Sequence, residues 1–297
     1  MIKRNHFFRQ GILAGLIVCT TIATSYAATT AGTFSTLTYN VAGLPQIVSS
    51  AESSRKEATG LISCYVNEFD IVNVQEDFNY HAALYDTCNN HPYRSSTSGP
   101  AGFGSGLNTM SRFPFSNMRR ESWDDCNGVD CLTPKGFTVA RVSLAPDVIV
   151  DVYNLHAQAQ TGEEDLIVRR KNLQQLLTFI SWFSAGQPVI VMGDTNTRYT
   201  RSGDNIRIFS EAGFQDAWLT LLRDHQPPAA GADALVCIPA TTSATCEIVD
   251  KILYRNSDKV QLNLVDYMVR EDDKNDQGQP LSDHPPVAAW WRYTVTP

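Results

Sequence analysis

The sequence predicts an α+β domain in which two β-sheets pack together and helices lie outside them. Three observations carry this prediction. Strand-like segments outnumber helical ones, and the helical segments fall between strands. No internal repeat or low-complexity segment interrupts this order, so a single compact unit accounts for most of the chain.

The first half of the chain contains a helix between strands. Residues 32–43 alternate like a strand, and residues 50–69 place apolar side chains at helical spacing after a serine-rich start. Residues 70–76 form a short apolar strand that ends in an acid, and residues 106–115 read as a strand and a turn. We therefore expect the first helix to connect two strands of one sheet.

The second half begins with a hairpin at 136–144 and 147–156, where alternating segments are separated by a short turn. Residues 163–183 predict the longest helix, because most apolar residues share one stripe and acids crowd its N-terminus. A short helix is expected at 204–214 and a long loop at 226–246. Further strands are predicted at 189–193, 247–255 and 285–295.

Residues 1–27 have the pattern of a secretory signal peptide. Three basic residues precede an apolar run between about residues 11 and 23, and small side chains at Ser25 and Ala27 suit cleavage near Ala27. The run is shorter than the roughly 18 apolar residues of a spanning helix. We expect a catalytic domain at 28–297 that is secreted to an extracellular or periplasmic location.

Six cysteines follow the predicted leader, an even number that favours disulfides in an exported protein. A metal site is disfavoured because the cysteines lack CxxC spacing and nearby histidines. Many pairings are open to six cysteines, and we predict the sequential set: Cys64–Cys88, Cys126–Cys131 and Cys237–Cys246.

The formal net charge is −7. An acidic protein does not grip polyanions over its whole surface, which argues against a processive nucleic-acid binder. A nuclease whose metal ion handles one phosphate is still compatible with this charge.

Polar side chains stand at the ends of the strand-like segments: Asn40, Glu76, His156, Asp194, Asn196, Asp250, Asp283 and His284. Each one alone is explained by local capping of a turn. Packed strands bring their ends together, however, so the whole set predicts a ring of side chains around one cleft.

The chemistry of this set favours phosphate-ester hydrolysis. Carboxylates and carboxamides are hard ligands that suit Mg²⁺, with Ca²⁺, Mn²⁺ or Co²⁺ as alternatives, and two separated histidines without cysteine do not resemble a zinc cage. One histidine could act as a general base and the other as a donor to the phosphate.

Six segments resemble, in order, the signature blocks of the endonuclease/exonuclease/phosphatase superfamily: TYNVAGLP, NVQED, YNLHAQA, VMGDTNTR, VDKILY and SDHPPV. The resemblance extends from about residue 34 to residue 293. It implies a four-layer α-β-β-α sandwich with two mixed β-sheets, as in deoxyribonuclease I-like proteins.

The resemblance also implies roles for the metal ligands and the base. Glu76 would be the principal metal ligand, with Asn40 beside it. His284 would deprotonate the attacking water, and Asp283 would orient its ring.

Four further matching residues would surround the phosphate. Asp194 would position the nucleophile, and Asn196 would hold a phosphate oxygen or help at the metal. His156 would stabilise the charge of the transition state, and Asp250 is an additional acid near the site. The implied mechanism is in-line attack by water without a covalent intermediate.

Two local features favour a phospholipid substrate. The segment GSGLNTMSRFPF and the Lys135-Gly136-Phe137 triplet resemble segments of neutral and bacterial sphingomyelinases, although the triplet could equally be an ordinary turn into a strand. We therefore predict a sphingomyelinase C-like phosphodiesterase. The alternatives are a secreted deoxyribonuclease-type endonuclease, an inositol-phosphate phosphatase and an inactive binding protein on the same fold.

Arg198 follows the acid and amide of the fourth motif, with Arg201 and Arg207 further along. These arginines are either a solvated loop or contacts to a phosphate or headgroup. Arg198 and Lys135 are our candidate substrate-binding residues, and the expected partner is a phospholipid headgroup or a nucleic acid.

Peripheral membrane contact would require exposed apolar side chains. The candidates are Trp123, Trp290, Trp291 and the loop around Phe103, but no long apolar hairpin is evident. Because Trp290 and Trp291 are adjacent, a strand would place at least one of them in the core. No obligate protein partner is inferred.

Overall fold

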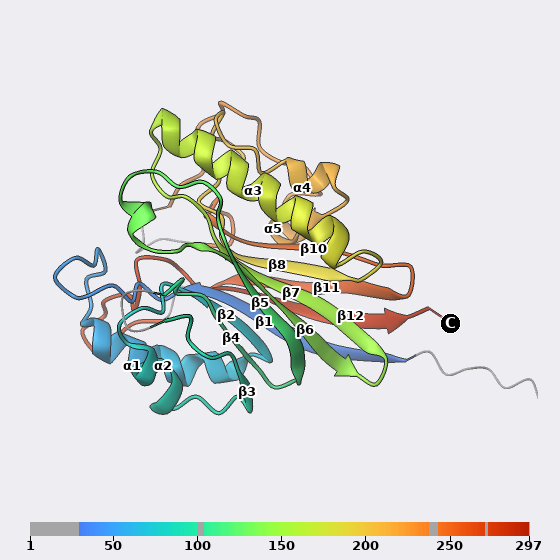
Figure 1. Ribbon diagram of the computed structural model, residues 1–297, viewed down its shortest axis with the longest axis horizontal. Coiled ribbons are helices and arrows are strands. Elements are labelled where there is room, and N and C mark those ends of the chain that lie inside the picture. Colours follow the sequence, from blue (N-terminus) through green and yellow to red (C-terminus); the bar gives the residue numbers. More distant parts are fainter. Residues whose placement is uncertain (1–29, 100–103, 238–242, 271–272, 297) are drawn as a thin grey trace, which may run out of the picture.

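The computed structural model describes residues 30–99, 104–237, 243–270 and 273–296. They form two six-stranded sheets that pack against each other, with helices on both outer faces (Figure 1). The expected four-layer sandwich is confirmed. The proposed signal peptide at 1–27 lies outside the described residues.

The first sheet contains both ends of the described chain. Its strand order is β11-β12-β1-β2-β4-β3, in which β1 and β2 are parallel and the other neighbours are antiparallel. The bounds are β1 Ala31–Asn40, β2 Ile71–Gln75, β3 Tyr93–Arg94, β4 Asn108–Ser111, β11 Val260–Val269 and β12 Val287–Val295.

The second sheet is formed by the middle of the chain. Its order is β5-β6-β7-β8-β10-β9, in which β7 and β8 are parallel. The bounds are β5 Phe115–Ser122, β6 Gly136–Ala145, β7 Val148–His156, β8 Val189–Asp194, β9 Gln215–Asp216 and β10 Asp250–Arg255.

Helices cover the two outer faces (Figure 1). On the first sheet lie α1 (Arg55–Tyr65) and α2 (His81–Asp86). The short 3-10 turn η1 (Val66–Glu68) directly follows α1. On the second lie α3 (Glu163–Phe183), α4 (Ile208–Glu211) and α5 (Ala217–Leu222). A further 3-10 turn, η2 (Gly128–Leu132), precedes β6.

The apolar core explains why these segments fold as they do. Every residue of β2 and β8 is buried, which is typical of central strands covered on both faces. The predicted bounds of α3 are confirmed, and Asp165 caps its first turn by accepting a hydrogen bond from the Gly162 amide at 3.1 Å.

Four edge strands and two short helices were not predicted. Strands β3 and β9 contain only two residues each. Strand β5 has no buried residue and is mostly polar, and β11 is interrupted by an irregularity between Leu264 and Asp266, so neither keeps a clean alternation. Helices α2 and α5 contain six residues each, too few for a helical period to stand out.

The three predicted disulfides are confirmed: Cys64–Cys88, Cys126–Cys131 and Cys237–Cys246. Disulfides are characteristic of proteins that leave the reducing cytosol. Within the described ranges, none of the helices is both long enough and apolar enough to cross a bilayer.

Candidate active site

Strand direction brings five of the predicted side chains to one edge of the sandwich. Strands β1 and β2 are parallel, so Asn40 ends β1 beside the end of β2, where Glu76 follows. Strands β7 and β8 are also parallel and pair His156 with Asp194. Strand β10 runs the other way, so its first residue, Asp250, pairs with Asp194 at the same edge. Each sheet therefore contributes part of the site.

Two of the predicted site residues have a left-handed backbone where their strands end. The φ angle is 58° at Glu76 and 52° at Asn196. A residue other than glycine in this conformation costs roughly 1–2 kcal/mol, so such positions often mark functional sites. The chain turns sharply at both points, immediately beyond the rigid strands.

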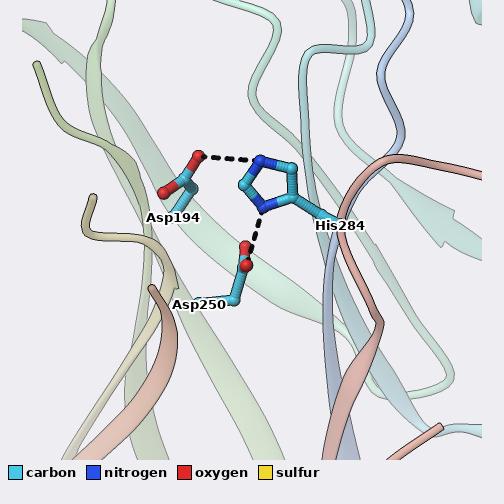
Figure 2. Close-up of side chains that lie close together, drawn as sticks. All are labelled: Asp194, Asp250 and His284. Atoms are coloured by element: carbon cyan, nitrogen blue, oxygen red, sulfur yellow. Dashed lines mark hydrogen bonds and ion pairs between the residues drawn. The ribbon is translucent and has the colours of Figure 1, made fainter. Parts of the chain in front are cut away.

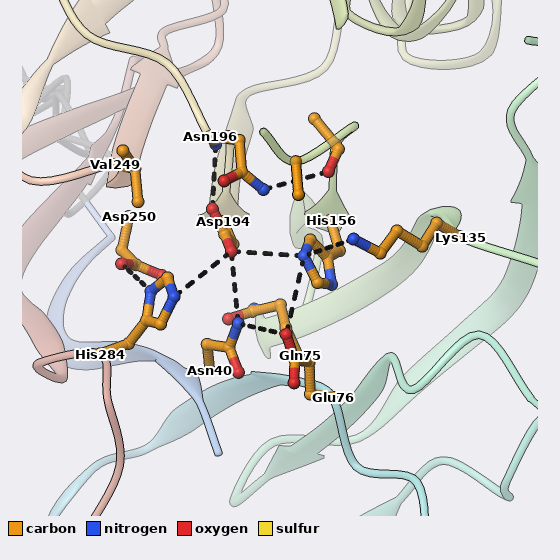
Figure 3. A network of polar contacts seen from close by, with 12 residues as sticks. Asn40, Gln75, Glu76, Lys135, His156, Asp194, Asn196, Val249, Asp250 and His284 are labelled. Carbon is orange, nitrogen blue, oxygen red and sulfur yellow. Dashed lines mark hydrogen bonds and ion pairs between the residues drawn. The ribbon is translucent and has the colours of Figure 1, made fainter. Parts of the chain in front are cut away.

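Asp194 is the central acceptor of the cluster (Figure 3). Its Oδ2 accepts from the Asn40 amide nitrogen at 3.2 Å and lies 3.3 Å from His156 Nε2 and 3.9 Å from His284 Nε2. Its Oδ1 accepts from the backbone amide of Asn196 at 2.9 Å. Burial raises the pKa of Asp194 to about 6, and the nearby His284 and Lys135 partly offset this rise.

Glu76 converges on the same donors. Its Oε1 accepts from the Asn40 amide nitrogen at 3.1 Å and lies 3.9 Å from His156 Nε2. The Asn40 side-chain oxygen accepts from the Ala42 amide at 3.0 Å, which turns the amide nitrogen toward the carboxylates of Glu76 and Asp194. Burial also raises the pKa of Glu76. The buried Asp194 and the partly buried Glu76, on either side of an uncharged amide, are a donor set that suits a divalent cation.

His284 lies between two carboxylates (Figure 2). Its Nδ1 is 2.7 Å from Asp250 Oδ2, and its Nε2 faces Asp194. Burial alone would lower the pKa of the ring, but Asp250 and Asp194 outweigh it and hold the pKa well above its usual value. The ligand atoms of these three side chains lie within 4.8 Å of one another, so this trio could also hold a metal ion.

The expectation that Asp283 orients the His284 ring is wrong. The carboxylate of Asp283 accepts a hydrogen bond from the Ser50 hydroxyl, and the ring nitrogen contacts Asp250 instead. Neighbours in a loop point in different directions, whereas β10 delivers Asp250 directly to the ring.

His156 is fully buried, and burial, with Lys135 nearby, lowers its pKa well below the usual value. The Lys135 ammonium lies 3.1 Å from His156 Nε2 and 2.8 Å from Asp130. His156 Nδ1 has no hydrogen-bond partner in the part of the chain that the structure describes. A neutral ring therefore accepts from Lys135, which brings positive charge to the site.

Asp130 is a member of this group that the sequence did not reveal. The sequence feature that could have identified Asp130 is its position inside the short Cys126–Cys131 loop, only a few residues before Lys135. Asn196, in contrast, was predicted, and its amide donates to the Ala157 carbonyl at 3.1 Å.

Of the three arginines after β8, only Arg198 lines a cavity at the site. This cavity of about 230 Å³ also touches Asp250 and His284. Arg201 binds Asp204 and the Asn196 carbonyl, and Arg207 binds the Tyr199 carbonyl. The Arg198 Nε is buried without a hydrogen-bond partner among the described residues, and burial lowers the pKa of Arg198.

Comparisons with known proteins agree with this architecture. The sphingomyelinase of Mycobacterium tuberculosis is 37% identical over 276 residues, which cover 90% of this chain and 54% of the relative. The chain thus spans about half the length of the curated relatives that it matches.

Two solved structures show the same fold at low identity. A beta toxin from Staphylococcus aureus with bound magnesium ions has a TM-score of 0.60 and 17% identity, covering 87% of this chain and 99% of the toxin. TDP2 from D. rerio, complexed with a single-strand DNA product, has a TM-score of 0.61 and 15% identity, covering 87% and 98%. At these identities the likeness concerns the fold alone.

The model of endonuclease/exonuclease/phosphatase family 2 matches residues 39–237, most of the described chain. That range includes Asn40, Glu76, His156 and Asp194, whereas His284 lies beyond it. By this match and by its two-sheet architecture, the chain belongs to the endonuclease/exonuclease/phosphatase family.

Proposed function

We propose that this protein is a secreted, divalent-metal-dependent phosphodiesterase of the sphingomyelinase C type. It would hydrolyse a phospholipid phosphodiester by in-line attack of water. The observation that carries the proposal is the cluster in Figure 3, where the buried Asp194, the partly buried Glu76, an Asp–His pair and a Lys–His pair meet at one edge. The 37% identity to sphingomyelinases favours the lipid over other phosphate esters.

The residues that would hold the metal are Glu76 and Asp194, with Asn40 beside them. Oxygen donors of this kind suit Mg²⁺, with Ca²⁺, Mn²⁺ or Co²⁺ as alternatives. Bound there, the ion would polarise a phosphate oxygen and offset the negative charge that raises the pKa of His284. The magnesium-bound beta toxin, which shares this fold, supports the choice of metal.

The proton of the attacking water would be taken by His284 at Nε2. Asp250 fixes the tautomer of the ring, because its carboxylate occupies Nδ1 at 2.7 Å and leaves Nε2 free to act as the base. Asp194, on the Nε2 side, would align the water.

The charge that develops on the phosphate would be stabilised from the other side. Lys135, which also contacts Asp130, would act from this side, and His156 lies between it and Asp194. Asn196 would hold a phosphate oxygen. Arg198 would contact the part of the substrate beyond the scissile phosphate, since it lines the cavity beside His284.

The tryptophans considered for membrane contact do not form an apolar surface. Trp291 is buried and stacks on Phe34, and Trp290 packs on Phe69. Trp123 is half-buried and donates to the His156 carbonyl at 2.7 Å. The loop around Phe103 lies outside the described residues.

Exposed aliphatic side chains lie instead on three segments that are close in sequence to site residues or line the site cavity. Ile47 is 93% exposed and Leu132 is 79% exposed, and the half-exposed Val236 lines the same cavity as His284. A lipid surface that contacted Val236 would lie beside the cavity that His284 lines. This contact would be peripheral, and no protein partner is required.

The test is a substrate panel of sphingomyelin, duplex DNA and inositol phosphates, each with Mg²⁺ and with EDTA. We expect Mg²⁺-dependent turnover of sphingomyelin, which His284→Ala abolishes and His225→Ala, a change at an exposed histidine, does not. Preferred hydrolysis of DNA or inositol phosphates would move the assignment to the corresponding alternative. A wild-type protein that hydrolyses none of them and binds no divalent ion would be a binding protein.

A further inference from the structure

Arg55, the first residue of α1, is fully buried. Among the described residues, no carboxylate oxygen lies within 4.0 Å of its guanidinium, so the charge has no ion-pair partner. Burial of a charge is costly unless hydrogen bonds replace the lost water. The contacts that replace it here are almost entirely backbone carbonyls.

The guanidinium joins three segments of the chain. Its Nη1 donates to the carbonyls of Val41 at 3.1 Å and Ala42 at 3.4 Å. Its Nη2 donates to the Leu281 carbonyl at 2.5 Å and to Ser53 Oγ at 2.7 Å, and its Nε donates to the Ser53 carbonyl at 3.2 Å. Only a planar fork with five donors can make this set of bonds.

Two of the joined segments carry site residues. Val41 and Ala42 follow Asn40 directly, and the Ala42 amide orients the Asn40 side chain. Leu281 precedes His284 by three residues. The Ser282 hydroxyl adds a direct link, since it donates to the Asn40 carbonyl at 2.6 Å. The segment 40–42, which we call the Asn40 arm, and the segment 281–284, which we call the His284 arm, therefore meet at one buried joint.

We infer that Arg55 is a positioning residue that sets the His284 arm against the Asn40 arm. It touches none of the reacting groups. Its fork fixes how far the base lies from the carboxylates that Asn40 contacts, and a displacement of about 1 Å at such a joint can cost about 100-fold in rate. This inference rests on the proposed function.

The test compares Arg55→Lys with Arg141→Lys. Both changes keep a positive charge and remove the fork, but Arg141 binds Asp151 at the far end of the second sheet. Each variant is assayed at the same interval below its own melting temperature, with kcat, KM and Mg²⁺ affinity by calorimetry as readouts. This design separates loss of geometry from loss of stability.

We expect Arg55→Lys to lower kcat by about 10- to 100-fold, with KM within about threefold, and to weaken Mg²⁺ binding. Arg141→Lys should lower the melting temperature while kcat and Mg²⁺ affinity stay within about threefold. If Arg55→Lys does not fold, Ser282→Ala tests the same joint with a smaller change and should lower kcat in the same direction.

An Arg55→Lys protein that melts earlier yet keeps wild-type kcat and Mg²⁺ affinity would overturn the inference, because Arg55 would then only stabilise the fold. Unchanged kcat in Ser282→Ala would do the same where it is the variant tested. If the wild type turns over no substrate, the proposed function fails instead, and the Mg²⁺ affinities of the variants still test the joint.

Discussion

Replacing Asp250 by asparagine tests whether Asp250, and not Asp283, holds the His284 ring in place. In the structure, Asp250 contacts Nδ1 at 2.7 Å and is only 1% exposed, so solvent screens this bond little. A hydrogen bond to a charged group is worth about 1.5–3 kcal/mol, and each 1.36 kcal/mol corresponds to a factor of ten in rate. Asp250→Asn should therefore lower kcat by about 10- to 150-fold.

The matched control is Asp283→Asn, which removes the same charge from the residue next to His284. Its carboxylate contacts Ser50 and not the ring, so we expect kcat within about threefold of the wild type. The assay is steady-state turnover of the best panel substrate at saturating Mg²⁺, with melting temperatures to confirm folding. Equal losses in the two variants, or full activity in Asp250→Asn, would refute the assignment of Asp250.

Two further predictions concern stability. The pKa of Asp194 is raised from 3.8 to about 6, so its contribution to stability is complete below about pH 4 and is lost, on the order of 3 kcal/mol, as pH rises to about 6. Without metal, the melting temperature of the wild type should therefore fall relative to that of Asp194→Asn as the pH rises through this interval. A difference between the two melting temperatures that does not change with pH would contradict this prediction. Gly193→Ala should lower the melting temperature by roughly 6–12 °C, because its Cβ would lie 2.2 Å from the Leu155 carbonyl oxygen at a φ of 153°. Gly186→Ala, with open space around it, should cost less, and calorimetry of both variants checks this.

Much of the site was predictable because strands impose simple rules. An apolar run followed by an acid or amide places that group at a sheet edge, and this rule identified Glu76 and Asp194. The periodic stripe of α3 likewise fixed its bounds. In both cases, short-range patterns in the sequence decide the local structure.

What could not be predicted depends on long-range register. Asp283 is next to His284 in the sequence, but Asp250, 34 residues away, holds the ring. The contact between Lys135 and His156 depends on the pairing of β6 with β7, which no local pattern encodes. The edge strand β5 also lacks the apolar alternation that reveals a strand, because none of its residues is buried in the core.

The division of the site between two sheets has a consequence for when the protein becomes active during synthesis. Asn40 and Glu76 belong to the first sheet, which the chain leaves at β4 to build the whole second sheet before returning with β11 and β12. His284 emerges from the ribosome after every other member of the cluster. A growing chain therefore lacks the proposed base until its last strand is being made, so the proposed activity would require the nearly complete chain.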